Sequence, residues 1–219
     1  MLKLAALISA RGGSKRFPGK NLALLGGVPL ISHSILYAKS APQLIQSVWV
    51  STDDNRIAEV AAEKGANLIT RPAEYATDIA TSASVVKHAL HFMPSDLDGV
   101  ILLQPTNPLR PVGLLESAIE LFATNKYDSV YSVSPLHRKV GFIENNQFRP
   151  VNYDFGERSQ DMKQLYFENG LIYISSVQTI LQDKIIGSNH GTLIVNHPYG
   201  QIDIDTEEDL KFAQWIMNQ

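Results

Sequence analysis

The sequence predicts an α/β fold in which a mostly parallel sheet is flanked by helices. Short apolar runs rich in β-branched residues alternate with longer segments that carry apolar residues every three or four positions, and this alternation is typical of parallel sheets with crossover helices. The chain has 219 residues, of which 44% are hydrophobic and 19% are charged, so it can bury one sizeable core. We therefore expect a single domain over residues 1–219.

Strands are predicted at short apolar runs, because strands covered on both faces are apolar along their whole length. These runs are residues 4–8, 47–51, 99–103 and 129–133, followed by two returning strands at 171–175 and 192–195. Helices are predicted between them at residues 29–41, 54–64, 83–92 and 112–123, with a closing helix at 206–217. Asp53 or Asp54 is expected to cap the second helix, and Thr206 or Asp205 the last one.

The segment of residues 136–169 breaks this pattern. It is polar and rich in Asn, Gln, Arg and aromatic residues, with Gly141 and Gly156 interrupting it. Because it does not continue the alternation of strands and helices, we predict that it is an insertion within the single domain.

Composition excludes several classes of function. The chain has no cysteine, which rules out disulfides, thiolate metal sites and a cysteine nucleophile. With 19 Lys and Arg against 22 Asp and Glu the formal net charge is −3, so a general attraction to nucleic acid or anionic lipid has no support. No apolar run approaches the roughly 20 residues of a membrane helix. We expect a cytoplasmic protein that binds neither nucleic acid nor membrane.

The loop after the first strand holds the densest chemistry of the chain. It is Ser9-Ala10-Arg11-Gly12-Gly13-Ser14-Lys15-Arg16-Phe17-Pro18-Gly19-Lys20-Asn21. Glycines let backbone N–H groups approach an anion, and Arg and Lys supply the opposing charge. The loop is no Walker A motif, because five residues separate Gly13 from Gly19 and Asn21 replaces the Ser or Thr, and the Rossmann fingerprint is absent too. A phosphate-binding loop of another kind is favoured over a solvated basic turn.

Two aspartates stand at alternate positions just before the last predicted helix. Asp203 and Asp205 flank Ile204, so both carboxylates can lie on one side of an extended segment. Such a pair can hold Mg²⁺ against a triphosphate, since Mg²⁺ takes a few carboxylates together with water and phosphate oxygens. The alternative is a helix cap with a solvated neighbour. The preceding phosphate loop favours the metal site.

These residues carry a family resemblance. Residues 10–15 and 18–21 resemble the signature of the sugar-acid cytidylyltransferases, in particular the N-acylneuraminate group. Further blocks agree in order and spacing, so that the resemblance covers nearly the whole chain: Val50-Ser51-Thr52-Asp53, Arg71-Pro72-Ala73-Glu74, Thr81-Ser82, Leu103-Gln104-Pro105-Thr106-Asn107-Pro108-Leu109-Arg110, Asn169-Gly170-Leu171-Ile172-Tyr173 and Ile202-Asp203-Ile204-Asp205-Thr206-Glu207. The fold implied is that of the nucleotide-diphospho-sugar transferases.

The resemblance implies an enzyme that transfers CMP from CTP to the anomeric hydroxyl of a nine-carbon 2-keto sugar acid, releasing pyrophosphate. It assigns catalysis to Arg11, Lys15, Lys20, Asp203 and Asp205, with Mg²⁺ bound by the two aspartates. It assigns the nucleotide to Arg11, Gly12, Gly13, Ser14, Lys15, Lys20, Asn21, Arg71 and Ser82. It assigns the sugar acid to Gln104, Arg158, Asn169 and Tyr173. In relatives the insertion packs against a second subunit, so a homodimer is implied.

Several departures from the family pattern leave the sugar open. Ser9 stands where many relatives have Pro, and Phe167-Glu168 precedes Asn169 where typical sialic acid enzymes have a basic residue. Residues 158–161 look closer to enzymes that act on legionaminic-type acids. Legionaminate or pseudaminate is therefore an alternative substrate, and 3-deoxy-manno-octulosonate a less favoured one. A GT-A glycosyltransferase and a non-catalytic nucleotide-binding protein are the alternatives from other classes.

Overall fold

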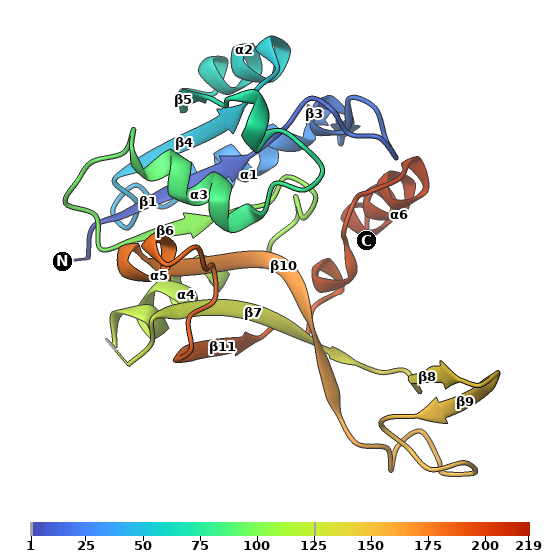
Figure 1. The fold of residues 1–219 in the computed structure, drawn as a ribbon. Helices are drawn as coiled ribbons and strands as arrows, with labels where there is room; N and C mark the ends of the chain where they lie inside the picture. The colour runs from blue at the N-terminus through green and yellow to red at the C-terminus, as the bar shows by residue number, and fades with distance from the viewer. Residues whose placement is uncertain (1, 125) are drawn as a thin grey trace.

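A computed structural model describes residues 2–124 and 126–219 of the chain. Its centre is a seven-stranded sheet (Figure 1). The strands lie in the order β11 (His190–Ile194), β7 (Ser129–Leu136), β10 (Leu165–Ser176), β6 (Gly99–Leu102), β1 (Leu4–Ser9), β4 (Ser47–Thr52) and β5 (Asn67–Thr70). Only β10 among these runs antiparallel to its neighbours. The predicted mostly parallel α/β sheet is therefore confirmed.

Helices cover both faces of this sheet. One face packs against α1 (Leu30–Lys39), α2 (Asn55–Glu63) and α4 (Leu114–Ala123), and the other against α3 (Ser82–Leu90) and α5 (Val177–Leu181). Strand β1 shows why its sequence is apolar throughout: Leu4, Ala6 and Ile8 join the first core, whereas Ala5 and Leu7 join the second. The predicted helices begin and end within two residues of the observed ones.

A third, smaller core attaches the C-terminal helix α6 (Glu207–Met217). It includes Leu25, Ile204 and Ala213, and joins α6 to the hairpin of β2 (Leu24–Leu25) and β3 (Val28–Pro29). Thr206 caps α6 in a capping box with Asp209. Of the two predicted caps for this helix, Thr206 is therefore the one used.

The predicted insertion projects away from the sheet as an arm. Strands β7 and β10 extend beyond their neighbours and lead to the hairpin of β8 (Gly141–Glu144) and β9 (Gln147–Pro150) (Figure 1). The returning strand begins at Leu165 rather than at the predicted residue 171. Its outer part pairs only with β7 and alternates between exposed and half-buried side chains, so its sequence lacks the apolar run of a central strand. We use "the arm" below for residues 137–164.

An irregularity in β10 separates its outer part from the part inside the sheet. The register shifts between Glu168 and Tyr173, and Gly170 adopts a positive φ of 72°. A Cβ at Gly170 would lie 2.5 Å from Oδ1 of Asn107. Glycine is therefore required both by the backbone conformation and by this close approach.

The described residues also form three short 3₁₀ helices: η1 (Lys20–Leu22), η2 (Ala73–Tyr75) and η3 (Pro198–Gln201). In the described ranges, no helix is long and apolar enough to cross a bilayer.

Candidate active site

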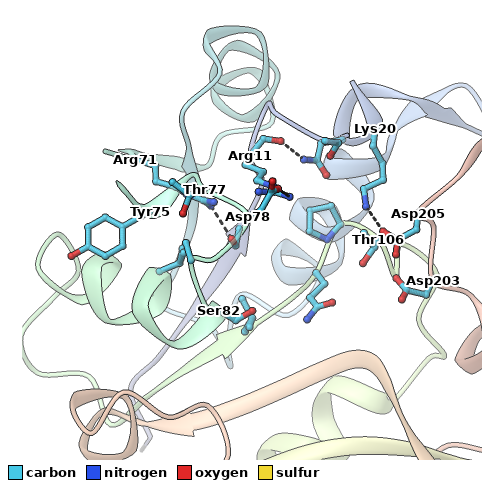
Figure 2. A pocket seen from close by; sticks show the side chains of 18 residues that line it. Arg11, Lys20, Arg71, Tyr75, Thr77, Asp78, Ser82, Thr106, Asp203 and Asp205 are labelled. Atoms are coloured by element: carbon cyan, nitrogen blue, oxygen red, sulfur yellow. Dashed lines mark hydrogen bonds and ion pairs between the residues drawn. The ribbon is translucent and has the colours of Figure 1, made fainter. Parts of the chain in front are cut away.

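A cavity of about 420 Å³, the main cavity, opens at the C-terminal ends of the sheet's parallel strands (Figure 2). Ser9 ends β1, Arg71 follows β5 and Gln104 follows β6, and all three line the cavity. It therefore lies beyond the carboxyl ends of parallel strands, where open α/β sheets bind ligands. The other lining residues come from the glycine-rich loop, from the segment between β5 and α3, and from the segment before α6: Arg11, Ser14, Lys20, Asn21, Tyr75, Thr77, Asp78, Ala80, Ser82, Val85, Leu102, Pro105, Thr106, Asp203 and Asp205.

The glycine-rich loop forms one wall of this cavity. Asn21 is buried and its side-chain amide donates to the backbone oxygen of Arg11 over 2.8 Å, which ties the two ends of the loop together. The N–H of Gly12 donates to Asp53, and a Cβ at Gly12 would come within 2.7 Å of Oδ2 of Asp54. Gly12 is thus needed for packing against the start of α2. A Cβ at Gly13 would meet nothing within 4 Å, so close packing within the protein does not explain this glycine.

The cations of the loop divide between two carboxylates. Nη2 of Arg11 and Nζ of Lys15 lie 2.8 Å and 2.5 Å from the two oxygens of Asp78. The hydrogen bonds from Lys15 and from Arg11 lower the pKa of Asp78. The loop is thereby connected to the opposite wall of the cavity, between β5 and α3. Lys15 itself is 81% exposed at its side chain and lies at the edge of the cavity rather than in its lining.

The second carboxylate is Asp205. It pairs with Arg16 and with Lys20, whose Nζ lies 2.7 Å from Oδ1 of Asp205 (Figure 2). The Lys20 side chain is only 12% exposed, so its charge is directed into the cavity rather than into bulk solvent. Arg16 was not among the residues predicted for the site.

Asp203 and Asp205 both line the cavity, as their alternate positions predict. Ile204 between them is fully buried, and its N–H donates to Thr106 over 2.8 Å, which turns both carboxylates toward the cavity. Partial loss of hydration raises the pKa of Asp203, the charge of Asp205 raises it further, and a hydrogen bond with the Thr106 side chain opposes both.

This pair fits the ligand chemistry of Mg²⁺. Among the described residues, no cluster of three or more His, Cys, Asp and Glu side chains forms a complete protein cage for a metal. Mg²⁺ usually takes one or two carboxylates and completes its shell with water and substrate phosphates. Asp203 and Asp205, opposite a basic loop, match that requirement.

Arg71 is buried on the far side of the cavity from the aspartates. Its Nε and Nη2 donate to Ser9 and to the side chain and backbone oxygen of Ser51. Burial lowers its pKa to about 10, against a smaller raising effect of Asp53. The guanidinium is thus held rigidly by the ends of two strands. Ser82, at the start of α3, lines the same cavity.

Two smaller cavities adjoin the first one beyond Gln104. One, of about 230 Å³, is lined by Gln104, Glu168, Tyr173, Asp203 and neighbouring residues, Asn169 among them. The other, of about 190 Å³, has an apolar wall of Leu102, Ile185 and Ile186. It shares Gln104, Glu168 and Tyr173 with the 230 Å³ cavity. Gln104, Asn169 and Tyr173, predicted for the sugar acid, therefore lie together.

The Asn169 side chain is occupied by the protein. It is buried, accepts from Ser132 over 2.6 Å, donates to Ser134 over 3.0 Å and accepts from the N–H of Leu171. These bonds hold the irregular part of β10. The geometry therefore gives Asn169 a structural task at the wall of the smaller cavity.

Arg158 is not brought into any of these cavities. It lies in the arm, its side chain is 73% exposed, and its Nε pairs with Asp161 over 2.7 Å. The described residues lining the 230 Å³ cavity include no Lys, Arg or His.

Besides Arg16, sequence reasoning missed Asp78, Glu168 and Arg110. Asp78 and Glu168 are single acidic residues in segments without periodicity, and no spacing signals that they face the cavities. Arg110 is buried and donates to the backbone oxygens of Gln104 and Leu171 over 3.0 and 2.6 Å. Burial lowers its pKa to about 10, against a raising effect of Tyr37. It fixes the strand end that carries Gln104.

A basic glycine-rich loop facing two aspartates at the carboxyl edge of a parallel sheet defines a class: enzymes that transfer a group from a nucleoside triphosphate. The cytidylyltransferase family model matches residues 5–217, and the chain belongs to this family. The resemblance read from the sequence is thereby confirmed.

Two curated relatives are similar to the chain over almost its whole length. The chain is 35% identical over 230 residues to CMP-N,N'-diacetyllegionaminic acid synthase of Legionella pneumophila subsp. pneumophila, covering 99% of this chain and 97% of that protein. It is 32% identical to the N-acylneuraminate cytidylyltransferase of Streptococcus agalactiae serotype III over 95% of this chain. The match spans only 52% of the streptococcal protein.

A solved structure shares the fold. The structure of CMP:2-keto-3-deoxy-manno-octonic acid synthetase complexed with CTP has a TM-score of 0.74 to this chain at 20% sequence identity, and the match covers 99% of both chains. At this identity the likeness supports the fold alone.

Proposed function

We propose that the protein transfers CMP from CTP to the anomeric hydroxyl of a nine-carbon 2-keto sugar acid, giving a CMP-sugar and pyrophosphate. The observation that carries the proposal is the cavity in which Arg11 and Lys20 face Asp203 and Asp205. Family membership over residues 5–217 makes the donor a cytidine nucleotide. The relatives that act on legionaminic and N-acylneuraminic acids supply the class of acceptor.

The reaction forms a bond between the anomeric oxygen and the α-phosphorus, and breaks the bond between the α-phosphorus and the oxygen that links it to the β-phosphorus. The hydroxyl proton passes to solvent, and the linking oxygen keeps the bonding electron pair and leaves as a terminal oxygen of pyrophosphate. Such a transfer depends mainly on positioning and on neutralising the phosphates. Arg11 and Lys20 in the cavity and Lys15 at its edge are the cations for this task, with Gly13 permitting close approach of the backbone.

Mg²⁺ is proposed as the metal, held by Asp203 and Asp205. When bound it would neutralise phosphate charge and act as a Lewis acid. The Lys20 ammonium pairs with Asp205 over 2.7 Å, so the loop and the aspartates are already in contact across the site. This contact sets the distance between the glycine-rich loop and the acidic wall of the cavity, which is formed by Asp203 and Asp205.

The nucleotide base is proposed to lie toward Arg71 and Ser82, and the sugar acid toward Gln104 and Tyr173. Gln104 lines the main cavity and both smaller ones, so it stands where the two substrates would meet. The apolar wall of Ile185 and Ile186 suits an acyl methyl group. This favours an N-acylated acid over 3-deoxy-manno-octulosonate.

A homodimer is part of the proposal. The 230 Å³ cavity on the sugar side is lined by the acidic side chains of Glu168 and Asp203. The proposed substrate also carries a negative charge, on its carboxylate, so the like charges would repel. A cation from a second copy, with Arg158 of the arm as the candidate, would balance this charge. Large apolar side chains exposed on the arm, Phe142 (56%), Ile143 (68%) and Phe155 (73%), suit burial in such an interface. The absence of a nucleic-acid partner and the cytoplasmic location stay predictions from the sequence.

The proposal is tested by pyrophosphate release from Mg²⁺-CTP. N-acetylneuraminate, N,N'-diacetyllegionaminate, pseudaminate and 3-deoxy-manno-octulosonate are offered separately, with ATP, GTP and UTP in place of CTP as controls. We expect release with CTP and one or more of the three nine-carbon acids. Release only with 3-deoxy-manno-octulosonate would contradict the proposed acceptor, and release with none while CTP binds would contradict the transfer itself.

A further inference from the structure

The walls of the two smaller cavities meet at Glu168 and Tyr173. Glu168 lies on the outer part of β10, paired with Val133 of β7, directly before the register shift, and Tyr173 follows the shift. Both side chains line both cavities. They are therefore in reach of any molecule that fills the space beyond Gln104.

The two side chains form a hydrogen bond of defined direction. The Tyr173 hydroxyl donates to Oε2 of Glu168 over 3.3 Å. Tyr173 keeps this proton at neutral pH, as an ordinary tyrosine does, and partial burial and the charge of Glu168 raise the pKa of its hydroxyl further. Its single proton is thus committed to the carboxylate, and its oxygen is left as an acceptor.

The resulting pair offers acceptors only. An ionised carboxylate cannot donate, and Oε1 of Glu168 has no hydrogen-bond partner among residues 2–124 and 126–219. Asp203, in the same 230 Å³ cavity, is also an acceptor. A ligand that meets this wall must bring hydrogen-bond donors, and its own carboxylate is repelled from it.

We infer that Glu168, supported by Tyr173, binds a hydrogen-bond donor of the sugar acid, an amide N–H or a hydroxyl, and thereby turns the substrate so that its carboxylate points away from β10. This rests on the proposed function, and it adds a residue to which the family resemblance assigns no role. The position departs from the basic residue of typical sialic acid enzymes. Glu168 is therefore a specificity-determining residue in this chain.

The test separates the two substrates by their KM values in the pyrophosphate-release assay. Glu168→Ala should raise the KM of the sugar acid about 10-fold, which corresponds to the loss of one hydrogen bond to a charged group. The KM of CTP should change less than about two-fold, because Glu168 does not line the main cavity. Glu168→Gln keeps one carbonyl acceptor and should recover part of the loss. Glu120→Gln, exposed on α4, is the matched control with unchanged kinetics.

Tyr173→Phe gives a second line of evidence. If the two side chains act as one acceptor set, combining Glu168→Ala with Tyr173→Phe should raise the KM of the sugar acid by less than the product of the two single effects. An unchanged or lowered sugar-acid KM in Glu168→Ala would overturn the inference, as would equal effects on both substrates. A wild-type protein inactive with every acid would instead refute the proposed function, so the two failures are distinguishable.

Discussion

Asp203 combines a functional assignment with a cost in stability. Its pKa is raised by partial loss of hydration and by Asp205, so its ionised form is less favourable in the folded chain than in the unfolded one. Above its folded-state pKa, the Asp203 carboxylate therefore lowers the free energy of unfolding, and this cost disappears as the pH falls through that pKa.

Asp203→Asn should reduce turnover by about 100-fold or more, because the variant lacks one of the two carboxylates proposed to hold Mg²⁺. It should not lower the melting temperature at pH 7, because it removes a charge that is unfavourable in the folded chain. CTP binding measured by calorimetry should persist, because the basic loop is untouched. Turnover within a few-fold of wild type would contradict the metal assignment. A large fall in the melting temperature would contradict the electrostatic argument.

Asp78 is expected to oppose nucleotide binding. Its carboxylate holds Arg11 and Lys15, and a triphosphate needs the same cations. Such exposed pairs are worth about 0–1 kcal/mol each, so Asp78→Asn should lower the KM of CTP by about two- to five-fold at low ionic strength. The difference should shrink at high salt because screening weakens all of these charges. A raised KM of CTP would mean that Asp78 instead orients Arg11 for the phosphates.

Which residues gather at the cavity can be predicted from the sequence where residue type and position coincide. Asp203 and Asp205 alternate before a helix, and the glycine-rich loop follows a strand, so their meeting at one edge of the sheet can be predicted. Glu168 and Asp78 carry no such signal, because their orientation depends on the register shift in β10 and on the irregular segment between β5 and α3. Arg158 shows the opposite case: the residue type suits a carboxylate, but it lies in the arm, outside these cavities.

At the scale of elements, the N-terminus of α6 stabilises the acidic wall. Thr206 accepts from the N–H of Asp209 over 3.2 Å, and Oδ2 of Asp209 accepts from the N–H groups of Asp205 and Thr206 over 3.0 and 2.8 Å. Burial raises the pKa of Asp209, but these hydrogen bonds outweigh it, and the pKa is lowered overall. Its stabilising contribution is therefore lost as the pH falls through that lowered pKa.

Thr206→Ala should cost about 1 kcal/mol of unfolding free energy, the usual value of an N-cap, which is about 2–4 °C in melting temperature for a chain of this size. Thermal unfolding followed by circular dichroism measures it. Ser117→Ala, on the exposed side of α4, is the control and should be neutral or slightly stabilising. Equal effects of both substitutions would argue against the capping box.

The elements that sequence reasoning missed share a physical cause. In β5 only Ile69 is buried, so this edge strand shows no apolar run. The outer part of β10 and the β8–β9 hairpin are largely exposed, and α5 has only five residues, too few to display a helical period. Periodicity detects elements that bury a face, and these elements bury little.

At the scale of the whole molecule, the arm is expected to make the dimer. Ile143→Asp places a charge on an exposed apolar position of the β8–β9 hairpin, and should convert the protein to a monomer in sedimentation analysis. Turnover should fall at least about 10-fold while CTP still binds, because the sugar-acid carboxylate would lose the cation that we propose comes from the arm of the second copy. Val112→Asp, at another exposed apolar position outside the arm, should change neither property. A monomeric wild-type protein with full turnover would refute this role of the arm.

The central claim is a transfer of CMP onto a sugar acid, and phosphorus NMR of the complete reaction tests it most directly. With Mg²⁺-CTP and the preferred nine-carbon acid, we predict that a phosphodiester signal of the CMP-sugar and the signal of pyrophosphate grow in equal amounts as CTP disappears. Formation of CDP and inorganic phosphate, or of CMP and pyrophosphate without a CMP-sugar, would contradict the account, because the nucleotide would then be hydrolysed rather than transferred.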